Sequence, residues 1–203
     1  MIERPILFSG PMVRAILEGR KTQTRRVVAL PKGAQPCNED NDFELDGTPE
    51  WPHAISRRSG CLAPLECPYG VPGDRLWVRE TWRSIALRGR GGDIEQFMYR
   101  ASIPFDVDVW KWKPGIHMPR HACRLVLEMT TVRVERLQEI GQQDVFAEGL
   151  HNAQQNEYEK KMGHRLSSQD CYRHLWNSLN AKRGYGWDKN PYVWVIEFKR
   201  VDR

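Results

Sequence analysis

The sequence has no long apolar segment and no recognisable export signal. Its 203 residues contain no run of about 20 apolar residues, the length that spans a bilayer. The start of the chain, Met-Ile-Glu-Arg-Pro, lacks the basic-then-apolar pattern of a signal peptide. We therefore expect a cytoplasmic protein that does not bind a membrane.

Cysteine is too irregularly spaced for a disulfide framework or a common zinc site. The five cysteines form no Cys-x-x-Cys pair, and their odd number does not suit complete pairing. His117, His121 and Cys123 lie close together in the sequence. A metal site there is the less favoured alternative to ordinary buried thiols. We therefore predict no metal and no cofactor.

The charge balance permits an anionic partner without requiring one. The formal net charge is +5 and the pI is about 9.0, and the basic residues are 22 Arg against 9 Lys. Arginine binds phosphate in bidentate fashion and stacks on bases, and the eight Trp residues offer further stacking surfaces. Two interpretations remain open at this point. One is a nucleic-acid surface, and the other is a Trp-rich core under a solvated arginine surface.

Alternating strands and capped helices organise the chain into one α+β domain over residues 1–203. We expect strands at 5–8, 75–82, 98–101, 122–134 and 192–198, an extended segment at 21–28, and helices at 11–18, 144–148 and from Ser167 or Ser168 to 179. The last helix would turn Cys171, Leu175, Trp176 and Leu179 inward. The proline-rich residues 30–70 are interpreted as an irregular insertion, and residues 83–96 and 102–116 as long loops. Together these elements predict a small, mostly antiparallel β-barrel with flanking helices and long loop insertions.

The segment 18–26, Glu-Gly-Arg-Lys-Thr-Gln-Thr-Arg-Arg, holds the most informative side chains. A lysine whose pKa is lowered by Arg20, Arg25 and Arg26 is able to act as a base beside a threonine nucleophile. The alternative is that Arg20 or Lys21 only caps the preceding helix. Following a helix end, Lys21 is expected to be partly exposed. Side chains of Lys21 and Thr24 point to opposite faces in a regular strand, so the chemistry requires Lys21 to lie in the turn.

Four segments resemble the ASCH family, in particular its phage and prophage members. They are residues 19–26, 69–82 (Tyr-Gly-Val-Pro-Gly-Asp-Arg-Leu-Trp-Val-Arg-Glu-Thr-Trp), 116–120 (Ile-His-Met-Pro-Arg) and 187–198 (Trp-Asp-Lys-Asn-Pro-Tyr-Val-Trp-Val-Ile-Glu-Phe). The resemblance covers nearly the whole chain. It implies a PUA-like fold and a partner that is RNA or a modified nucleoside. No obligate protein partner is evident.

The resemblance also implies a reaction. One small bacterial member hydrolyses the amide of N4-acetylcytidine with a lysine, a threonine and a glutamate. These residues correspond here to Lys21, Thr24 and Glu148, with Glu80 as the alternative glutamate. In that mechanism Lys21 takes the proton of Thr24, Thr24 attacks the acyl carbon, and Glu148 passes the proton to the leaving amine. Backbone N–H groups or Arg79 would hold the oxyanion.

Two further functions stay open, a non-catalytic RNA-binding module and a metal-independent ribonuclease that uses Lys21 and His117. The pattern Trp-Lys-Trp-Lys at 110–113 interleaves aromatic and basic residues, although packing of the indoles on the domain is the favoured interpretation. Basic pairs at 57–58 and around 88–90 suit phosphate contacts. The candidate substrate-binding residues are Arg20, Arg25, Arg26, Arg79, Glu80, Trp82, Tyr99, His117 and Arg120.

Overall fold

The structure, a computed structural model, describes residues 1–29, 34–36, 53–56, 62–64, 66–89, 92–103, 110–150, 160, 163 and 165–201. At its centre is a five-stranded sheet in the order β1-β6-β9-β10-β2. Its strands are β1 (Glu3–Leu7), β2 (Gln23–Val27), β6 (Arg75–Arg79), β9 (Val126–Arg136) and β10 (Tyr192–Val201). Strands β1 and β6 are parallel, and every other neighbouring pair is antiparallel. The expected α+β class and the mostly antiparallel sheet are confirmed.

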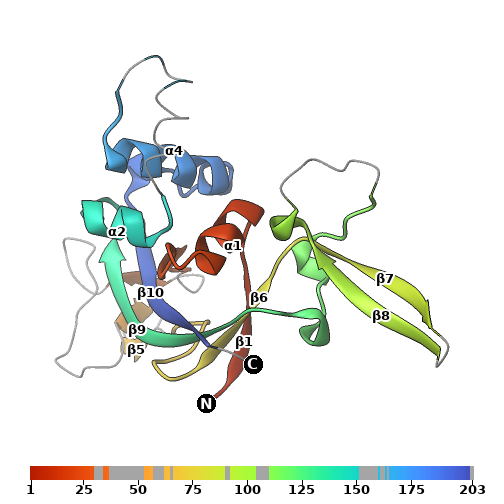
Figure 1. The fold of residues 1–203 in the computed structure, drawn as a ribbon. Coiled ribbons are helices and arrows are strands. Elements are labelled where there is room, and N and C mark those ends of the chain that lie inside the picture. The colour runs from red at the N-terminus through yellow and green to blue at the C-terminus, as the bar shows by residue number, and fades with distance from the viewer. Residues whose placement is uncertain are drawn as a thin grey trace.

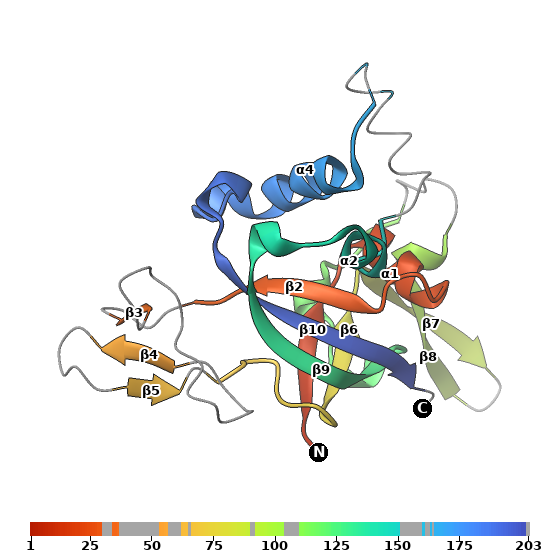
Figure 2. The ribbon, with the colours of Figure 1, turned by 90° about the vertical axis from the view of Figure 1, so that its left-hand side faces the viewer.

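The central sheet is open in the part of the chain that the structure describes. Its edges are β1 and β2, which three strands separate from each other. The expectation of a closed barrel is therefore wrong for these residues. The physical reason is that helix α4, which Figure 2 shows lying across from β2, borders the free edge of this strand where a barrel would continue its sheet.

A hairpin takes the place of the loop expected at 83–96. Strands β7 (Trp82–Gly89) and β8 (Gly92–Tyr99) pair from Trp82 opposite Tyr99 to Gly89 opposite Gly92. Figure 1 shows the hairpin projecting from the body on the side away from α2 and α4. The loop prediction was wrong because the glycines mark only the tip, while the residues on either side of them pair as strands. Of the short strand expected at 98–101, residues 98–99 are the end of β8, and residues 100–101 lie in a 3₁₀-helix (Arg100–Ser102).

Strands also occur inside the expected insertion at 30–70. β3 (Ala34–Pro36), β4 (His53–Ser56) and β5 (Leu62–Pro64) form a three-stranded antiparallel sheet, which Figure 2 shows to one side of the central sheet. The basic pair at 57–58 lies outside the described residues, as do Cys37, Cys61 and residues 104–109 of the loop expected at 102–116.

Helices cover both faces of the central sheet. They are α1 (Gly10–Leu17), α2 (Gln142–Ala147), α4 (Ser168–Asn180) and the short 3₁₀-helices η1 (Arg100–Ser102), η2 (Gly115–His117), η3 (Arg120–Ala122), η4 (Leu137–Glu139), η5 (Ala181–Arg183) and η6 (Trp187–Lys189). The side chain of Ser167 accepts the N–H of Asp170 and caps α4, as its sequence predicts. No helix among the described residues is long and apolar enough to cross a membrane.

The alternation of β10 divides the core into two layers. Trp194, Ile196 and Phe198 pack with side chains of α1 and β1, whereas Val193 and Val195 pack with residues of α2 and α4. Because successive strand residues point to opposite faces, one apolar strand supplies both layers. Each fully buried aliphatic or aromatic side chain contributes about 1.5–3 kcal/mol. The layers hold α1 and α2 against the two faces of β2, and the candidate site lies between these helices.

Candidate functional site

The end of α1 and the start of β2 place Lys21. Gly19 has a φ of 72°, a left-handed conformation that glycine adopts without strain. The N–H groups of Arg20 and Lys21 both donate to the carbonyl of Ala15, at 2.8 and 3.0 Å. Because β2 begins at Gln23, Lys21 lies in the turn before the regular pleat, as the expected chemistry requires.

The same turn is joined to the end of α2. Lys21 and Glu148 form an isolated antiparallel bridge, and the N–H of Thr22 donates to the carbonyl of Ala147 at 2.9 Å. Gly149 follows with a φ of 91°, and a Cβ at this position would lie 3.0 Å from the Cβ of Lys21. The glycine therefore lets α2 end in direct contact with the turn.

The Lys21 side chain is fully buried and fully hydrogen-bonded. Its Nζ donates to Oε2 and the carbonyl of Glu148, each at 2.8 Å, and to the carbonyl of Gln23 at 2.7 Å. The side chain is 0% exposed, so the expectation of partial exposure is wrong, because α2 packs over the turn. Burial lowers the pKa of Lys21; Glu148 opposes this shift, and Arg26 and Arg25 add to it.

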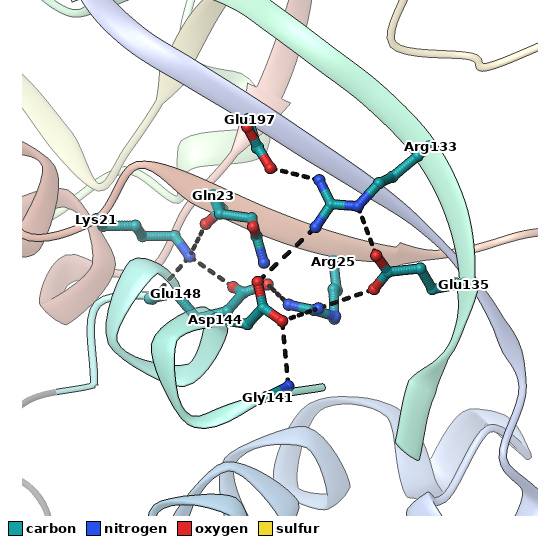
Figure 3. Close-up of polar contacts among 9 residues, drawn as sticks. All are labelled: Lys21, Gln23, Arg25, Arg133, Glu135, Gly141, Asp144, Glu148 and Glu197. Atoms are coloured by element: carbon teal, nitrogen blue, oxygen red, sulfur yellow. Dashed lines mark hydrogen bonds and ion pairs between the residues drawn. The ribbon is translucent and has the colours of Figure 1, made fainter. Parts of the chain in front are cut away.

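Arg25 extends this contact into a network of carboxylates. Its Nη2 donates to Oε2 of Glu135 at 3.1 Å and lies 3.3 Å from Oδ2 of Asp144. Its Nη1 lies 3.5 Å from Oε1 of Glu148. The Arg25 side chain is 0% exposed. Figure 3 shows that Arg25 lies between Glu148 and Glu135 and so joins α2 to β9.

The outer part of the network is built on Arg133. Its guanidinium binds Glu135 and Glu197 and lies 3.8 Å from Oδ1 of Asp144 (Figure 3). Glu197 is thus paired with Arg133. Partial burial raises the pKa of Asp144, but the Gly141 N–H and the nearby arginines together lower it below its ordinary value.

Three buried atoms of this network have no hydrogen-bond partner among the described residues. They are Oε1 of Glu148 and Nε and Nη1 of Arg25. Glu148 is 5% exposed and Arg25 is 4% exposed. Leaving such a group unpaired costs about 1–3 kcal/mol, and native proteins pair the great majority of them. Two of the three, Nη1 of Arg25 and Oε1 of Glu148, face each other as an ion pair at 3.5 Å.

A cavity of about 250 Å³ lies along the free edge of β2. Its walls come from β2, from α1, from the first residue after α2, from α4 and η5, and from Tyr69. Among its lining residues are Thr24, Arg25, Arg26, Glu148, Tyr172 and Trp176. The volume is close to the lower end of the range typical of small-molecule sites.

The ladder between β2 and β10 fixes the direction of the edge peptide groups. The carbonyl of Thr22 accepts the N–H of Phe198 at 2.9 Å. Hydrogen-bonded pairs alternate with non-bonded pairs in an antiparallel ladder. The peptide groups of Arg25 and Val27 therefore point away from β10, and both residues line the cavity.

Thr24 and Arg25 lie on opposite faces of β2. Thr24 is opposite Ile196, in the core layer of α1, and Arg25 is opposite Val195, in the layer of α2 and α4. Thr24 is 3% exposed and lines the cavity. No hydrogen bond joins Thr24 to Lys21 among the described residues. The expected direct proton transfer from Thr24 to Lys21 therefore lacks a contact.

Two other arginines of the motif have different environments. Arg26 donates to the carbonyl of Leu7 at 2.7 Å and lines the cavity. Arg20 binds the carboxylate of Glu18 and donates to the carbonyl of Gly149 at 3.0 Å, outside the cavity lining. Arg26 is therefore placed to meet a ligand, and Arg20 stabilises the turn.

Another group of the expected substrate-binding residues lies beside β7. Glu80 is 1% exposed and receives two hydrogen bonds from Arg124, at 2.8 and 2.9 Å. Trp82 belongs to a separate core cluster, and the hydroxyl of Tyr99 donates to the carbonyl of Ala122 at 2.7 Å. Glu148, and not Glu80, is the glutamate that contacts Lys21.

The remaining three expected residues also lie away from the cavity. Arg79 stacks over the ring of Trp77 with its guanidinium carbon 5.4 Å from the ring centre. Arg120 binds Glu3 at 2.8 and 3.1 Å, and His117 is exposed on η2. None of the three lines the cavity. The oxyanion role expected for Arg79 has no geometric basis, because β9 and β10 separate its strand from β2.

The described residues hold no group of three or more His, Cys, Asp or Glu that is placed to bind a metal ion. This finding includes His117, His121 and Cys123, which the sequence brings close together. Cys123 is instead buried, with its Sγ 3.1 Å from the carbonyl of Leu125.

Sequence reasoning missed the part that α4 plays in the site. Tyr172 and Trp176 are both 3% exposed and form an aromatic wall of the cavity. Burial and the charge of Glu148 raise the pKa of Tyr172 well above its ordinary value. The helical spacing of Tyr172 with Leu175 and Trp176 was the available signal. Leu179 was expected to point inward but is 48% exposed at the end of α4.

Comparisons of the chain with protein-family models, with curated proteins and with solved structures found no match. The functional argument therefore depends on the geometry of the site and on the motifs in the sequence.

Proposed function

We propose that the cavity beside β2 binds a cytidine-like base and hydrolyses an N-acyl group on it, either in a free nucleoside or in RNA. The observation that supports this most is the buried pair of Lys21 and Glu148 behind a cavity that Glu148 and Thr24 both line. Clusters of buried, perturbed ionisable groups at a cavity are typical of catalytic sites. We also propose that the chain belongs to the ASCH family and has its PUA-like fold. A phage or prophage source and a cytoplasmic location are part of the same proposal.

The contacts favour a change in the roles first expected for the three residues. Glu148, whose Oε1 lies 3.5 Å from Nη1 of Arg25 and which lines the cavity together with Thr24, takes the proton of the Thr24 hydroxyl as Thr24 attacks the acyl carbon. The same proton then passes to the amine as the amide bond breaks and an ester forms on Thr24. A water molecule cleaves this ester, giving a proton to Thr24 through Glu148 and leaving the carboxylic acid. Lys21 acts as a positioning residue, since it holds Oε2 of Glu148 at 2.8 Å.

Arg25, and not Arg79, is the buried arginine beside Glu148, from whose Oε1 its Nη1 lies 3.5 Å. Its Nε and Nη1 have no hydrogen-bond partner among the described residues, and its side chain is 0% exposed. A buried cation with unused donors stabilises developing negative charge more strongly than an exposed one. The carboxylates of Glu135 and Asp144 hold the guanidinium from the other side.

The test is incubation with N4-acetylcytidine and with a single-stranded RNA that contains it, followed by mass spectrometry. We expect acetate and the deacetylated base as products, and no product from Thr24→Val, which removes the hydroxyl and keeps the shape. If neither substrate yields acetate, the hydrolase proposal is wrong.

One observation favours a second candidate, a module that binds the base without catalysis. All three N–H groups of the Lys21 ammonium donate to protein acceptors, an arrangement that suits a permanently charged structural lysine. This candidate predicts RNA binding without turnover. The affinity of the protein for RNA should fall steeply between low and high salt, because arginines that contact phosphates release counterions from the RNA. No affinity at low salt would exclude it. The ribonuclease is not proposed, because the described contacts do not join His117 to Lys21.

A further inference from the structure

The hairpin of β7 and β8 packs on the body of the protein through one of its two faces. This inner face carries Trp82, Phe97 and Tyr99, which form a separate core cluster with Met118 and Cys123. The ring centres of Trp82 and Phe97 lie 5.8 Å apart. The inner face therefore accounts for how the projecting hairpin is held (Figure 1).

The outer face of the hairpin carries the residues that alternate with these, because successive strand residues point to opposite faces. They are Arg83 and Ile85 on β7, which lie opposite Met98 and Gln96 on β8. Gln96 is exposed, and the other three side chains are partly exposed. A two-stranded hairpin is at best marginally stable by itself in water. Apolar side chains on its outer face thus have a reason to be there other than the packing of the hairpin on the body.

The Trp-Lys-Trp-Lys segment widens this outer face. Trp82 and Lys113 exchange two backbone hydrogen bonds, at 3.1 and 2.8 Å, and so join the segment to β7. The guanidinium carbon of Arg83 lies 5.1 Å from the ring centre of Trp110, and the rings of Trp110 and Trp112 are 6.1 Å apart. Both tryptophans are partly exposed. One surface, which we call the hairpin face, is thus made of Arg83, Ile85, Met98, Trp110 and Trp112.

The charge of this surface is positive. Lys111 and Lys113 are exposed beside the tryptophans, and no carboxylate in the described part of the chain forms an ion pair with Arg83, Lys111 or Lys113. Glu95 lies opposite Ala86 and alternates with the outer residues of β8, so it belongs to the other face. Complementary charge guides the docking of partners, and the hairpin face therefore suits an acidic one.

The composition and geometry of the hairpin face favour a protein over a nucleic acid. Trp, Met and Arg are enriched in the centres of protein interfaces, and charged side chains belong to the rims. Single-stranded nucleic acids instead need open ring faces on which successive bases stack. Here Arg83 covers one face of Trp110, and the planes of Trp110 and Trp112 are inclined by 58°. The two indoles therefore do not form a pair of parallel stacking platforms.

We propose that the hairpin face docks a segment of a partner protein in which acidic residues flank an apolar side chain. The apolar side chain contacts Trp110 and Trp112, and the acidic residues pair with Arg83, Lys111 and Lys113. None of these five residues lines the cavity beside β2. The docking surface is therefore independent of the proposed function, and either can fail without the other.

A displayed library of random short peptides, selected on the immobilised wild-type protein, tests the kind of partner. We expect the enriched peptides to combine Asp or Glu with a large apolar residue and to bind in solution, as measured by fluorescence anisotropy. Enrichment of peptides without acidic residues, or no enrichment, would overturn the proposal. Oligouridylate RNA is measured in the same way. RNA that binds more tightly than the peptides and displaces them would assign the surface to nucleic acid.

Two pairs of charge reversals locate the binding. Lys111→Glu with Lys113→Glu should weaken binding of the selected peptides at least about tenfold, because like charges then face each other. Lys182→Glu with Lys189→Glu changes the net charge equally on exposed lysines of η5 and η6, and should weaken it by less than about twofold, because distant exposed charges are screened. Trp110→Ala should cost about 30-fold as the loss of a central aromatic anchor. Equal losses in the two lysine pairs would show attraction to the overall charge alone and would overturn the proposal. If Trp110→Ala does not fold, the lysine pairs decide.

Discussion

Lys21 and Glu148, 127 residues apart in the chain, meet twice: through a side-chain ion pair and through the hydrogen bond from Nζ to the Glu148 carbonyl, both at 2.8 Å. The double contact ties the turn after α1 to the end of α2. It also explains why a buried lysine is tolerated, since the carboxylate and two carbonyls replace the water that Lys21 loses.

The first prediction concerns the stability of this pair. Lys21→Ala leaves the Glu148 carboxylate buried without its cation, and we expect a loss of about 3–5 kcal/mol in the free energy of unfolding. Urea denaturation measures it. Lys199→Ala, which breaks the exposed pair with Glu128, is the control and should cost no more than about 1 kcal/mol. A Lys21→Ala protein as stable as this control would contradict the buried pair.

The second prediction concerns catalysis by Thr24. Thr24→Ser keeps the hydroxyl and should retain part of the turnover of N4-acetylcytidine. Thr24→Ala should lower the rate at least about a hundredfold, because no other residue supplies the nucleophile. Single-turnover kinetics with mass spectrometric detection measure the rates, and thermal melting checks that both variants fold. Near-normal turnover by Thr24→Ala would show that water attacks the acyl carbon directly.

The third prediction concerns acid stability and Asp74. The N–H of Ile2, at 2.7 Å, is the main cause that lowers the pKa of Asp74, with smaller contributions from the Val71 N–H and Arg4. The ionised form is therefore favoured in the folded state, where the pKa of Asp74 lies below the ordinary aspartate value of 3.8. Its stabilisation is complete above pH 3.8 and is lost as the pH falls through the lower folded value.

We expect Asp74→Asn to lose about 1.5–3 kcal/mol at neutral pH. The difference from wild type should shrink as the pH falls below 3.8. Chemical denaturation at a series of pH values measures both. A constant difference over that range would mean that the carboxylate charge does not contribute.

The fourth prediction separates backbone strain from crowding. Gly149 and Gly184 have similar φ values, 91° and 87°, but a Cβ at 149 would lie 3.0 Å from the Cβ atoms of Ala15 and Lys21, while one at 184 would have nothing within 4 Å. In both Ala variants the left-handed conformation lowers the free energy of unfolding by about 1–2 kcal/mol. Gly149→Ala should be more destabilised than Gly184→Ala, because it also displaces the turn. Equal losses of stability in thermal denaturation would show that the turn moves away from the added Cβ without an energetic cost.

The elements that the sequence predicts well are those with local signals. The strand expected at 192–198 and the Ser167 cap of α4 depend on neighbours within a few residues, and both are confirmed. The hairpin of β7 and β8 was missed because its tip dominates the local composition, while its pairing is a property of both strands together. The open edge at β2 depends on where α4 packs, which no local pattern encodes.

The site was only partly predictable for the same reason. Lys21 and Thr24 come from a short motif, but the burial of Lys21 depends on Glu148, which α2 brings from far along the chain. The resemblance pointed to Glu148, and the residues alone left Glu80 as an alternative. Arg25 was expected to contact substrate, but its carboxylate partners on β9 and α2 are visible only in three dimensions.

The strand order also has a consequence for protein synthesis. The ribosome makes β2 before β10, which starts at Tyr192 and is the strand that pairs with β2 in the described part of the chain. In a nascent chain, the segment that carries Lys21 and Thr24 therefore has no partner strand until β10 has been synthesised. This non-local pairing forms late in folding. Prematurely terminated copies that lack β10 would be unable to assemble the cavity. The site is therefore able to assemble only after β10 has been synthesised.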